Sequence, residues 1–456
     1  MRRDDIDMQA NDRVARLHTM LRGSPYTAYL YSYPHKTAHR PLDPAVPLST
    51  LWADERRDAL FLYIHVPFCA MRCGYCNLLS QKGRPRSGQV LGFLDALERQ
   101  ARAVRAALKE ASFARLAVGG GTPTMLGLSE LDRLLDVAQR IMGAEPSIPG
   151  CVEVSPETVT REKLALLRER GIDRISVGIQ SFVEAELGAL RRRQSPGRVH
   201  RSLELVRELG FPTLNIDLIY GIEGQDIRGW DVSLDQALRY RPEEIYLYPL
   251  YVRPLTQLGE DRRSWDDQRL ELYRHARDRL RGVGYNQISM RMFQAPHAGA
   301  GGPAEKAPLY RCQQDGMVGL ACGARSYTTH LHYSTPYGVS PAAVNALIDA
   351  YIARSDRSFS FADHGIRLDA EDRRRRHVIQ SLLLCEGLDL AYFRRRFETE
   401  ALEDLPELAA LVDQGLARRG ADRLALTEAG LERSDVIGPW LHSDRVQGLM
   451  DRHELR

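Results

Sequence analysis

The sequence has no run of apolar residues long enough to cross a membrane. A membrane-spanning helix needs about 20 consecutive apolar residues, and no run of even about 18 occurs in the 456 residues. The first residues, Met1-Arg-Arg-Asp-Asp-Ile-Asp7, also lack the apolar stretch of a signal peptide. We therefore expect a cytoplasmic protein without a membrane partner.

Cysteine and net charge are also scarce. The 7 cysteines are an odd and sparse set, which argues against a disulfide framework. With 63 Lys and Arg against 60 Asp and Glu, the formal net charge is only +3, so no overall basic field would attract nucleic acid. Hydrophobic residues make up 43% of the chain, as in ordinary globular proteins. The composition indicates a large cytosolic enzyme of two or three domains with no nucleic-acid partner.

Three of the seven cysteines stand close together, directly after an apolar segment. Cys69, Cys73 and Cys76 follow residues 60–67 with the spacing i, i+4, i+7. Three thiolates on one tight loop can each bind one iron of a 4Fe–4S cube, which leaves the fourth iron open to a small molecule. The alternative is a structural zinc site with His65 as its fourth ligand, although zinc cysteines usually come in paired Cys-x-x-Cys units. The spacing favours the cluster and hence an enzyme.

From Leu60 onward, short apolar segments alternate with amphipathic ones. Helices are predicted over residues 90–108 and from Ser129, whose hydroxyl would be the N-cap. Six strand–helix units predict an α/β fold, a parallel sheet curved into a partial (β/α)6 TIM-like barrel whose site lies at the carboxyl ends of the strands. The predicted strands are residues 60–67, 113–118, 151–154, 174–179, 214–219 and 245–250.

Changes in pattern divide the chain into four parts. Residues 1–55 are predicted to be an N-terminal extension, 56–335 the α/β core, and 336–355 a linker. Residues 356–456 are predicted to form a smaller α+β domain with the helix, hairpin and helix of a winged helix. The arginine runs at 373–376 and 394–396 could support DNA binding, but a solvated helix face explains them better.

Polar residues stand at or near the ends of the predicted strands. Three glycines precede Thr122 after the second strand, and Glu153, Gln180 and Asp217 belong to the next three strands. A barrel would point these groups at one shared ligand, and the glycine N–H groups can form an anion- or amine-binding concavity. For any one of these groups a satisfied polar core residue is the alternative. Because such polar groups recur at the ends of several strands, a shared ligand-binding site is favoured.

The sequence resembles the radical S-adenosylmethionine (SAM) enzymes. Within them it is similar to the oxygen-independent coproporphyrinogen III oxidase-like branch (HemN and HemW type), which also holds radical methyltransferases. The resemblance covers roughly residues 55–330, and residues 360–440 resemble the C-terminal domain of that branch. It rests on the cysteine loop and on the motifs at residues 63–69, 119–124, 174–182, 215–221 and 246–254.

The resemblance implies two cofactors. Cys69, Cys73 and Cys76 would hold a 4Fe–4S cluster, and SAM would chelate the open iron. An electron from a low-potential donor such as flavodoxin or ferredoxin would cleave SAM to methionine and a 5′-deoxyadenosyl radical. In this branch a second SAM can bind, for which Tyr251 and Arg325 are the matching candidates. The matching residues for the first SAM are Tyr63, Tyr75, Asn77, Gly120, Gly121, Thr122, Glu153, Gln180, Arg192 and Asp217.

The reaction itself stays open at this point. The resemblance implies a small-molecule or porphyrin-like substrate that is oxidised or methylated at an unactivated carbon, or, as the alternative, a haem-binding chaperone on the same scaffold. Residues 1–55 would then cover the active site, and residues 33–40 supply cations and aromatic rings for an anionic or planar substrate. Leu78 stands where the oxidases carry an additional cysteine, which argues against coproporphyrinogen decarboxylation. Cys312 and Cys322 are expected to be buried, inert thiols.

Overall fold

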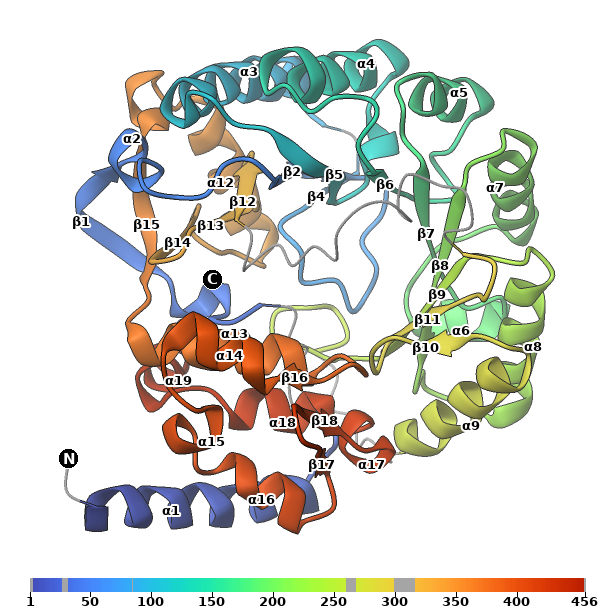
Figure 1. Ribbon diagram of the computed structural model, residues 1–456. Coiled ribbons are helices and arrows are strands. Elements are labelled where there is room, and N and C mark those ends of the chain that lie inside the picture. The colour runs from blue at the N-terminus through green and yellow to red at the C-terminus, as the bar shows by residue number, and fades with distance from the viewer. Residues whose placement is uncertain (1–2, 27–31, 84, 260–267, 299–315, 455–456) are drawn as a thin grey trace.

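One large mixed sheet organises the protein. The computed structural model describes residues 3–26, 32–83, 85–259, 268–298 and 316–454. In this part of the chain, 13 strands follow the order β1-β15-β14-β13-β12-β2-β5-β6-β7-β8-β9-β11-β10, in which β11 (Met292–Gln294) and β10 (Asn286–Gln287) form one edge. Figure 1 shows the helices as a ring outside the curved sheet. Cys312 lies outside the described residues.

The six predicted parallel strands are confirmed. Each pairs in parallel with the next along the chain. A seventh parallel strand, β12 (Met317–Leu320), was not predicted and pairs with β2 on the side away from β5. The six are β2 (Leu60–Val66), β5 (Phe113–Gly120), β6 (Gly150–Val154), β7 (Arg174–Gln180), β8 (Thr213–Tyr220) and β9 (Glu244–Pro249).

Helices cover only the outer face of the parallel strands. Outward-facing side chains such as Leu62, Val152 and Ile216 are fully buried, and burying each contributes roughly 1.5–3 kcal/mol. Parallel sheets are usually covered on both faces, yet on the inner face Glu153 is exposed and Asp217 is only half-buried. Solvent therefore reaches the inner face. The covering helices are α3 (Gln89–Leu108), α4 (Leu128–Asp136), α5 (Arg161–Glu169), α7 (Pro196–Glu208), α8 (Ile227–Leu238) and α9 (Arg269–Gly282).

The helix expected from Ser129 begins one residue earlier. In α4 the N-cap is Gly127, and the Glu130 carboxylate accepts a hydrogen bond from the Gly127 N–H at 2.7 Å. The predicted Ser129 cap is therefore wrong, because the Glu130 side chain satisfies the first free N–H group in its place.

The N-terminal extension is largely ordered into regular structure. Its first helix, α1 (Arg3–Arg22), packs against α18 (Ser434–Trp440), and the Trp440 indole N–H donates to the Arg13 carbonyl at 2.8 Å. A short helix, η1 (Lys36–Ala38), precedes β1 (Arg40–Pro47), which pairs with β15 (Phe361–Arg367) at the sheet edge. The beginning of the chain is thus packed against its end.

The segment predicted as a linker contains a helix. Residues Pro341–Ile352 form α12, which packs on α3, so 336–355 is not an irregular connection. The main sheet also continues to β15, beyond residue 356. The helix, hairpin and helix predicted for the smaller α+β domain are present, and the domain boundaries stay a prediction. Its elements include α13 (Ala370–Leu382), β16 (Leu388–Asp389), α14 (Leu390–Phe397), α16 (Leu408–Asp413), β17 (Ala417–Arg419), β18 (Arg423–Leu426) and α19 (Asp444–Asp451).

The two arginine runs differ in burial. Arg375 and Arg376 are 5% and 3% exposed, so a solvated face is the wrong interpretation for them. Arg375 is paired with Glu407 at 2.8 Å, which offsets the cost of burying its charge. The side chains of residues 394–396 are exposed, as expected. Within the described ranges, no helix has the length and apolar character needed to cross a bilayer.

Candidate active site

The cysteine loop leaves the sheet at the carboxyl end of β2 and is held at both its base and its tip. At the base, β3 (Phe68–Cys69) pairs with β4 (Gln81–Lys82). At the tip, the Gly74 N–H donates to the Leu190 carbonyl and the Leu258 N–H donates to the Gly74 carbonyl, each at 2.9 Å. The loop therefore has a fixed shape before any cofactor binds.

The three cysteine sulfurs share one space. A guanidinium N–H of Arg192 donates to Cys73 Sγ at 3.1 Å, and Cys69 Sγ lies 3.2 Å from Thr122 Oγ1. Burial first, then the Cys73 thiol, and to a smaller extent the Cys69 thiol, raise the pKa of Cys76 to about 12. Iron would keep such thiols deprotonated. The three thiols influence one another's ionisation and lie beside the buried Arg192 guanidinium. This arrangement fits a negatively charged cluster.

His65 is not available as a zinc ligand. Its Nε2–H donates to the Leu79 carbonyl at 2.8 Å, and the Tyr63 hydroxyl donates to Nδ1 at 3.3 Å. Burial lowers the pKa of His65 to about 4, so the ring stays neutral. Across the described residues, no three His, Cys, Asp or Glu side chains converge as ligands of one metal ion. A 4Fe–4S cube does not need this convergence, because each thiolate binds its own iron.

The glycines after β5 allow the cysteine loop to approach the sheet. A Cβ atom on Gly120 would lie 2.6 Å from the His65 ring, and one on Gly121 would lie 2.4 Å from the Phe68 carbonyl oxygen. Gly120 also has a φ of +108°, which side-chain-bearing residues rarely adopt. These two positions therefore require glycine for packing.

The N–H groups of this segment do not form the expected concavity. The N–H groups of Gly120, Gly121 and Thr122 already donate to protein acceptors, so the expected concavity of N–H groups does not form at these residues. A ligand amine would instead have to meet carbonyl oxygens here, because amines are donors. The donor–acceptor pairs are Gly120 N–H to Glu153 Oε2 at 3.1 Å, Gly121 N–H to the Val66 carbonyl at 2.8 Å, and Thr122 N–H to the Phe68 carbonyl at 2.8 Å.

Two carboxylates lie on the inner face, on the two strands that flank β7. Glu153 on β6 and Asp217 on β8 lie on either side of β7, and the Asn215 amide donates to Asp217 Oδ1 at 2.8 Å. The interior of the barrel hydrates a charged carboxylate less well than bulk water does, which raises the pKa of Glu153 to about 7 and that of Asp217 to about 6, and the charge of Asp217 adds to the rise at Glu153. Both groups therefore titrate close to neutral pH, where they can accept hydrogen bonds from ligand hydroxyl or amine groups.

The raised pKa of Glu153 predicts a pH-dependent cost to stability. An unfolded Glu titrates near 4.3, so between this pH and about 7 the folded chain binds a proton that the unfolded chain does not. Stability should then fall as the pH rises through this window. We expect Glu153→Gln to raise Tm at pH 8 but to have little effect at pH 5. Thermal unfolding of the apo-protein measures this, with the exposed Glu162→Gln as the control. Equal effects at both pH values would contradict the assignment.

Gln180 and Arg192 lie where β7 departs from regular geometry. The register of β7 against β8 shifts between Gly178 and Gln180, and Gln180 has a φ of +71°. Such backbone costs of order 1–3 kcal/mol in a non-glycine residue and tends to occur at functional sites. Arg192 is 9% exposed and also donates to the Gly178 carbonyl at 2.5 Å. This contact connects the cysteine loop to the end of β7.

The remaining candidate residues are spread over several elements. Tyr75 packs against an apolar cluster that includes Leu190 and Leu258, and the Asn77 carbonyl accepts a hydrogen bond from Tyr337 at 3.1 Å. Both residues therefore help to seat the cysteine loop.

The two second-SAM candidates are held by different ends of the chain. The Tyr251 hydroxyl donates to Asp435 of α18, and Arg325 donates to Ser32 Oγ at 2.7 Å. Tyr251 is thus attached to the C-terminal domain and Arg325 to the N-terminal extension.

Sequence reasoning did not single out Lys36. Its ammonium lies 3.6 Å from the centroid of the Tyr337 ring, a cation–π contact. Burial, and then the charge of Arg325, lower the pKa of Lys36, whereas Cys76 raises it. Lys36 is therefore close to both the cysteine loop and Arg325. The mixture of cations and aromatic rings in residues 33–40 was the available signal, but it did not identify the residue.

Comparison with known proteins agrees with this site. Family models match residues 63–237 (Radical SAM superfamily) and 368–432 (HemN C-terminal domain). The oxygen-independent coproporphyrinogen III oxidase of Paracoccus denitrificans is 30% identical over 399 residues, which cover 83% of this chain and 85% of that protein. The chain belongs to the radical SAM superfamily, in the oxygen-independent coproporphyrinogen III oxidase-like family. Family membership implies a 4Fe–4S cluster and SAM as cofactors.

Other members of the family match over similar lengths. The oxygen-independent coproporphyrinogen III oxidase of Pseudomonas aeruginosa is 28% identical over 438 residues, covering 90% of this chain and 91% of that protein. The haem chaperone HemW of Bacillus subtilis is 26% identical over 388 residues, covering 83% and 98%. The solved structure of coproporphyrinogen III oxidase (HemN) from Escherichia coli has a TM-score of 0.76 at 23% identity, covering 91% and 96%, which shows the shared fold.

Proposed function

We propose that this radical SAM protein oxidises a substrate of the porphyrinogen class that carries carboxylate groups. Leu78 replaces an additional cysteine of the oxidases that is not among the three cluster ligands, so radical formation does not require that cysteine. The observation behind the proposal is the position of Lys36, which the N-terminal extension places over the Tyr337 ring at 3.6 Å and within electrostatic range of Cys76 and Arg325. Burial and the charge of Arg325 lower the pKa of Lys36, so an anionic substrate is favoured over a neutral one, because its carboxylate would stabilise the charged ammonium through strong charge-assisted hydrogen bonds.

The chain's own residues would position the reaction. When bound, the cluster and SAM supply a 5′-deoxyadenosyl radical after one electron arrives from a low-potential donor. Cys69, Cys73 and Cys76 would hold the cluster, and Arg192 would fix Cys73 and offset the negative charge of the thiolates. Lys36 would bind a substrate carboxylate and so bring the neighbouring carbon toward the inner face of the sheet.

The N-terminal extension would exclude water from the reaction. The Tyr33 hydroxyl is buried and donates to Asp372 Oδ1 at 3.1 Å, and it also accepts a hydrogen bond from the Ser443 N–H at 3.2 Å. These bonds hold residues 32–40 against the C-terminal domain. A closed site protects a radical from side reactions.

The lengths of the matches do not separate oxidation from haem transfer. The Pseudomonas aeruginosa oxidase covers 90% of this chain, but the Paracoccus denitrificans oxidase and HemW each cover 83%. The choice of oxidation therefore rests on Lys36. A haem chaperone and a methyltransferase that uses a second SAM are the alternative outcomes of the test below.

Replacing Lys36 tests the substrate class. We expect Lys36→Gln to raise KM for a carboxylate-bearing substrate at least about tenfold, since a charge-assisted bond contributes roughly 1.5–3 kcal/mol. Production of 5′-deoxyadenosine without substrate should be unchanged. Lys109→Gln, an exposed position after α3, is the matched control. Equal KM values for the wild type and Lys36→Gln would contradict a carboxylate contact.

Product analysis distinguishes the three reactions. The reconstituted protein would be incubated anaerobically with SAM, a strong reductant and coproporphyrinogen III, followed by mass spectrometry of substrate and SAM products. Oxidation predicts one 5′-deoxyadenosine and one methionine for each carbon dioxide that leaves the substrate, with the electron left on the substrate radical passing to an added one-electron acceptor. S-adenosylhomocysteine with a methylated product would instead support methyl transfer. Stoichiometric haem binding without either product would support the chaperone and overturn the proposal.

A further inference from the structure

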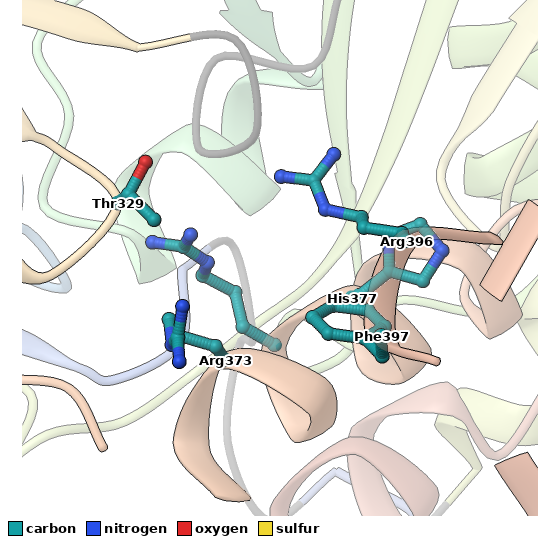
Figure 2. Close-up of a pocket in the computed structure, with 6 residues that line it drawn as sticks. Thr329, Arg373, His377, Arg396 and Phe397 are labelled. Carbon is teal, nitrogen blue, oxygen red and sulfur yellow. The ribbon is translucent and has the colours of Figure 1, made fainter. Parts of the chain in front are cut away.

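A separate hollow lies near the amino ends of the parallel strands, whereas the cysteine loop lies at their carboxyl ends. Its volume is about 180 Å³, and it is lined by Thr329, Arg373, Arg376, His377, Arg396 and Phe397. Thr329 comes from the turn between β13 (Arg325–Tyr327) and β14 (Leu331–Ser334) of the main sheet, and the other lining residues come from α13 and α14. Figure 2 shows Thr329 and the Arg396 guanidinium facing each other across it.

The pairing register of the main sheet shows where the hollow lies along the strands. Tyr327 is opposite Met317, which pairs with Phe61 near the amino end of β2. The cysteine loop follows the carboxyl end of β2, seven residues long, so roughly 20 Å of strand separates the two regions. The hollow is therefore not part of the radical SAM site.

Three guanidinium groups meet at the hollow without a carboxylate partner. Among the residues that the structure describes, no ion pair within 4.0 Å involves Arg373, Arg376 or Arg396. Arg376 is 3% exposed and donates to His332 Nε2 at 2.6 Å. Burial first, then the charges of Arg396 and Arg373, lower the pKa of Arg376 to about 10. Arg376 is thus a buried charge with two further guanidinium groups near it, an unfavourable arrangement that a bound anion would offset.

Three neighbouring arginines on the same two helices are paired, whereas the exposed Arg395 has no ion pair within 4.0 Å among the described residues. Arg374 contacts Asp404 at 3.2 Å, Arg375 contacts Glu407 at 2.8 Å, and Arg394 contacts Glu400. The one acid beside the hollow that affects Arg376, Glu55, accepts two hydrogen bonds from Thr329 at 2.8 Å each. Within the described residues, acids thus pair with three of the arginines around the hollow and with none of the three that line it, whose hydrogen bonds go to neutral groups such as Tyr392 and His332.

We propose that this hollow binds a phosphate-class oxyanion, either inorganic phosphate or the phosphate group of a small metabolite. Planar guanidinium forks match the oxygens of a phosphate group, and a dianion offsets more of the three charges than a single carboxylate does. The volume admits one or two phosphate groups but not a nucleic-acid strand. Because the lining comes from both the main sheet and the C-terminal domain, bound phosphate would join the two. The proposal does not depend on the proposed reaction.

Binding measurements on the full-length reconstituted protein test the site. Titration calorimetry in a phosphate- and sulfate-free buffer would use inorganic phosphate, pyrophosphate and citrate as separate ligands. We expect saturable one-site binding of phosphate or pyrophosphate, weakened at least about tenfold in the double variant Arg373→Gln/Arg396→Gln. The matched control is Arg394→Gln/Arg395→Gln, which removes two exposed charges from α14 outside the hollow and should bind as the wild type does. Tighter pyrophosphate than phosphate binding would point to a phosphorylated metabolite.

Thermal unfolding shows whether a variant that loses binding is still folded. Without anion, Arg373→Gln/Arg396→Gln should unfold at the same temperature as the wild type or higher, because a repulsion is removed. Added phosphate should raise Tm of the wild type and the control but not of this variant. The proposal is overturned if neither phosphate nor pyrophosphate shows saturable binding, or if the control variant loses binding equally. It is also overturned if citrate binds as tightly as phosphate, or if duplex DNA binds through the lining arginines and phosphate does not.

Discussion

Replacing Cys73 with alanine is expected to abolish iron binding and SAM cleavage together. Cys73 is buried between Arg192 and the other two cysteines, so its loss removes one of only three protein ligands of the cube. Iron per chain should fall to near background, and 5′-deoxyadenosine should fall below detection. Iron and sulfide analysis, the low-temperature EPR spectrum of the reduced protein and mass spectrometry of SAM products measure these effects.

Cys385→Ala is the matched control for this substitution. Cys385 is exposed and follows α13, far along the chain from the cysteine loop, so its loss should leave iron content and SAM cleavage unchanged. Full iron content and full 5′-deoxyadenosine production in Cys73→Ala would mean that the three cysteines are not the cluster ligands.

Replacing Gly121 with alanine should have a nearly equal effect without changing any ligand. The new Cβ would lie 2.4 Å from the Phe68 carbonyl oxygen and 3.0 Å from that of Val66. Both obstacles are backbone atoms, so β3 and the cysteine loop would have to move away from the end of β5. We expect a loss of stability of roughly 1–3 kcal/mol, as in other overpacked sites, and little or no cluster after reconstitution.

A second glycine provides the comparison. Gly188 lies in α6 (Glu184–Ala189), where a Cβ atom would meet nothing within 4 Å. Gly188→Ala should therefore be neutral or stabilising by roughly 0.5–1 kcal/mol, with normal iron content. Chemical unfolding and iron analysis of both variants measure the contrast. Wild-type stability and iron content in Gly121→Ala would show that the close approach of the loop to β5 is not needed.

The parallel strands and the cysteine loop could be predicted because their signals are local. Each strand is a short apolar run, and the alternation with helices leaves few topologies. The cysteines and glycines are adjacent in sequence, so their spacing carries the chemistry. The strand-end carboxylates Glu153 and Asp217 followed from the same alternation, and the register places them on either side of β7.

The errors concern partners that are distant in sequence. Arg375 appeared solvated because its partner Glu407 is 32 residues away, and His65 appeared to be a possible zinc ligand because its bond to Leu79 depends on how the loop returns. A ligand-binding concavity was expected after β5 because the acceptors of the Gly120, Gly121 and Thr122 N–H groups lie on β6, β2 and β3. Lys36 was missed because only the packing of the N-terminal extension brings it to Cys76.

Transfer of deuterium from substrate to SAM product tests the central claim most directly. Coproporphyrinogen III deuterated on the carbon chains that bear its carboxylates would be incubated with the reconstituted protein, SAM and a strong reductant, with Cys73→Ala as the blank. The proposed reaction predicts 5′-deoxyadenosine that gains deuterium in proportion to carbon dioxide released. Unlabelled 5′-deoxyadenosine with unchanged substrate, or labelled product from Cys73→Ala, would contradict a substrate radical formed at the cysteine loop.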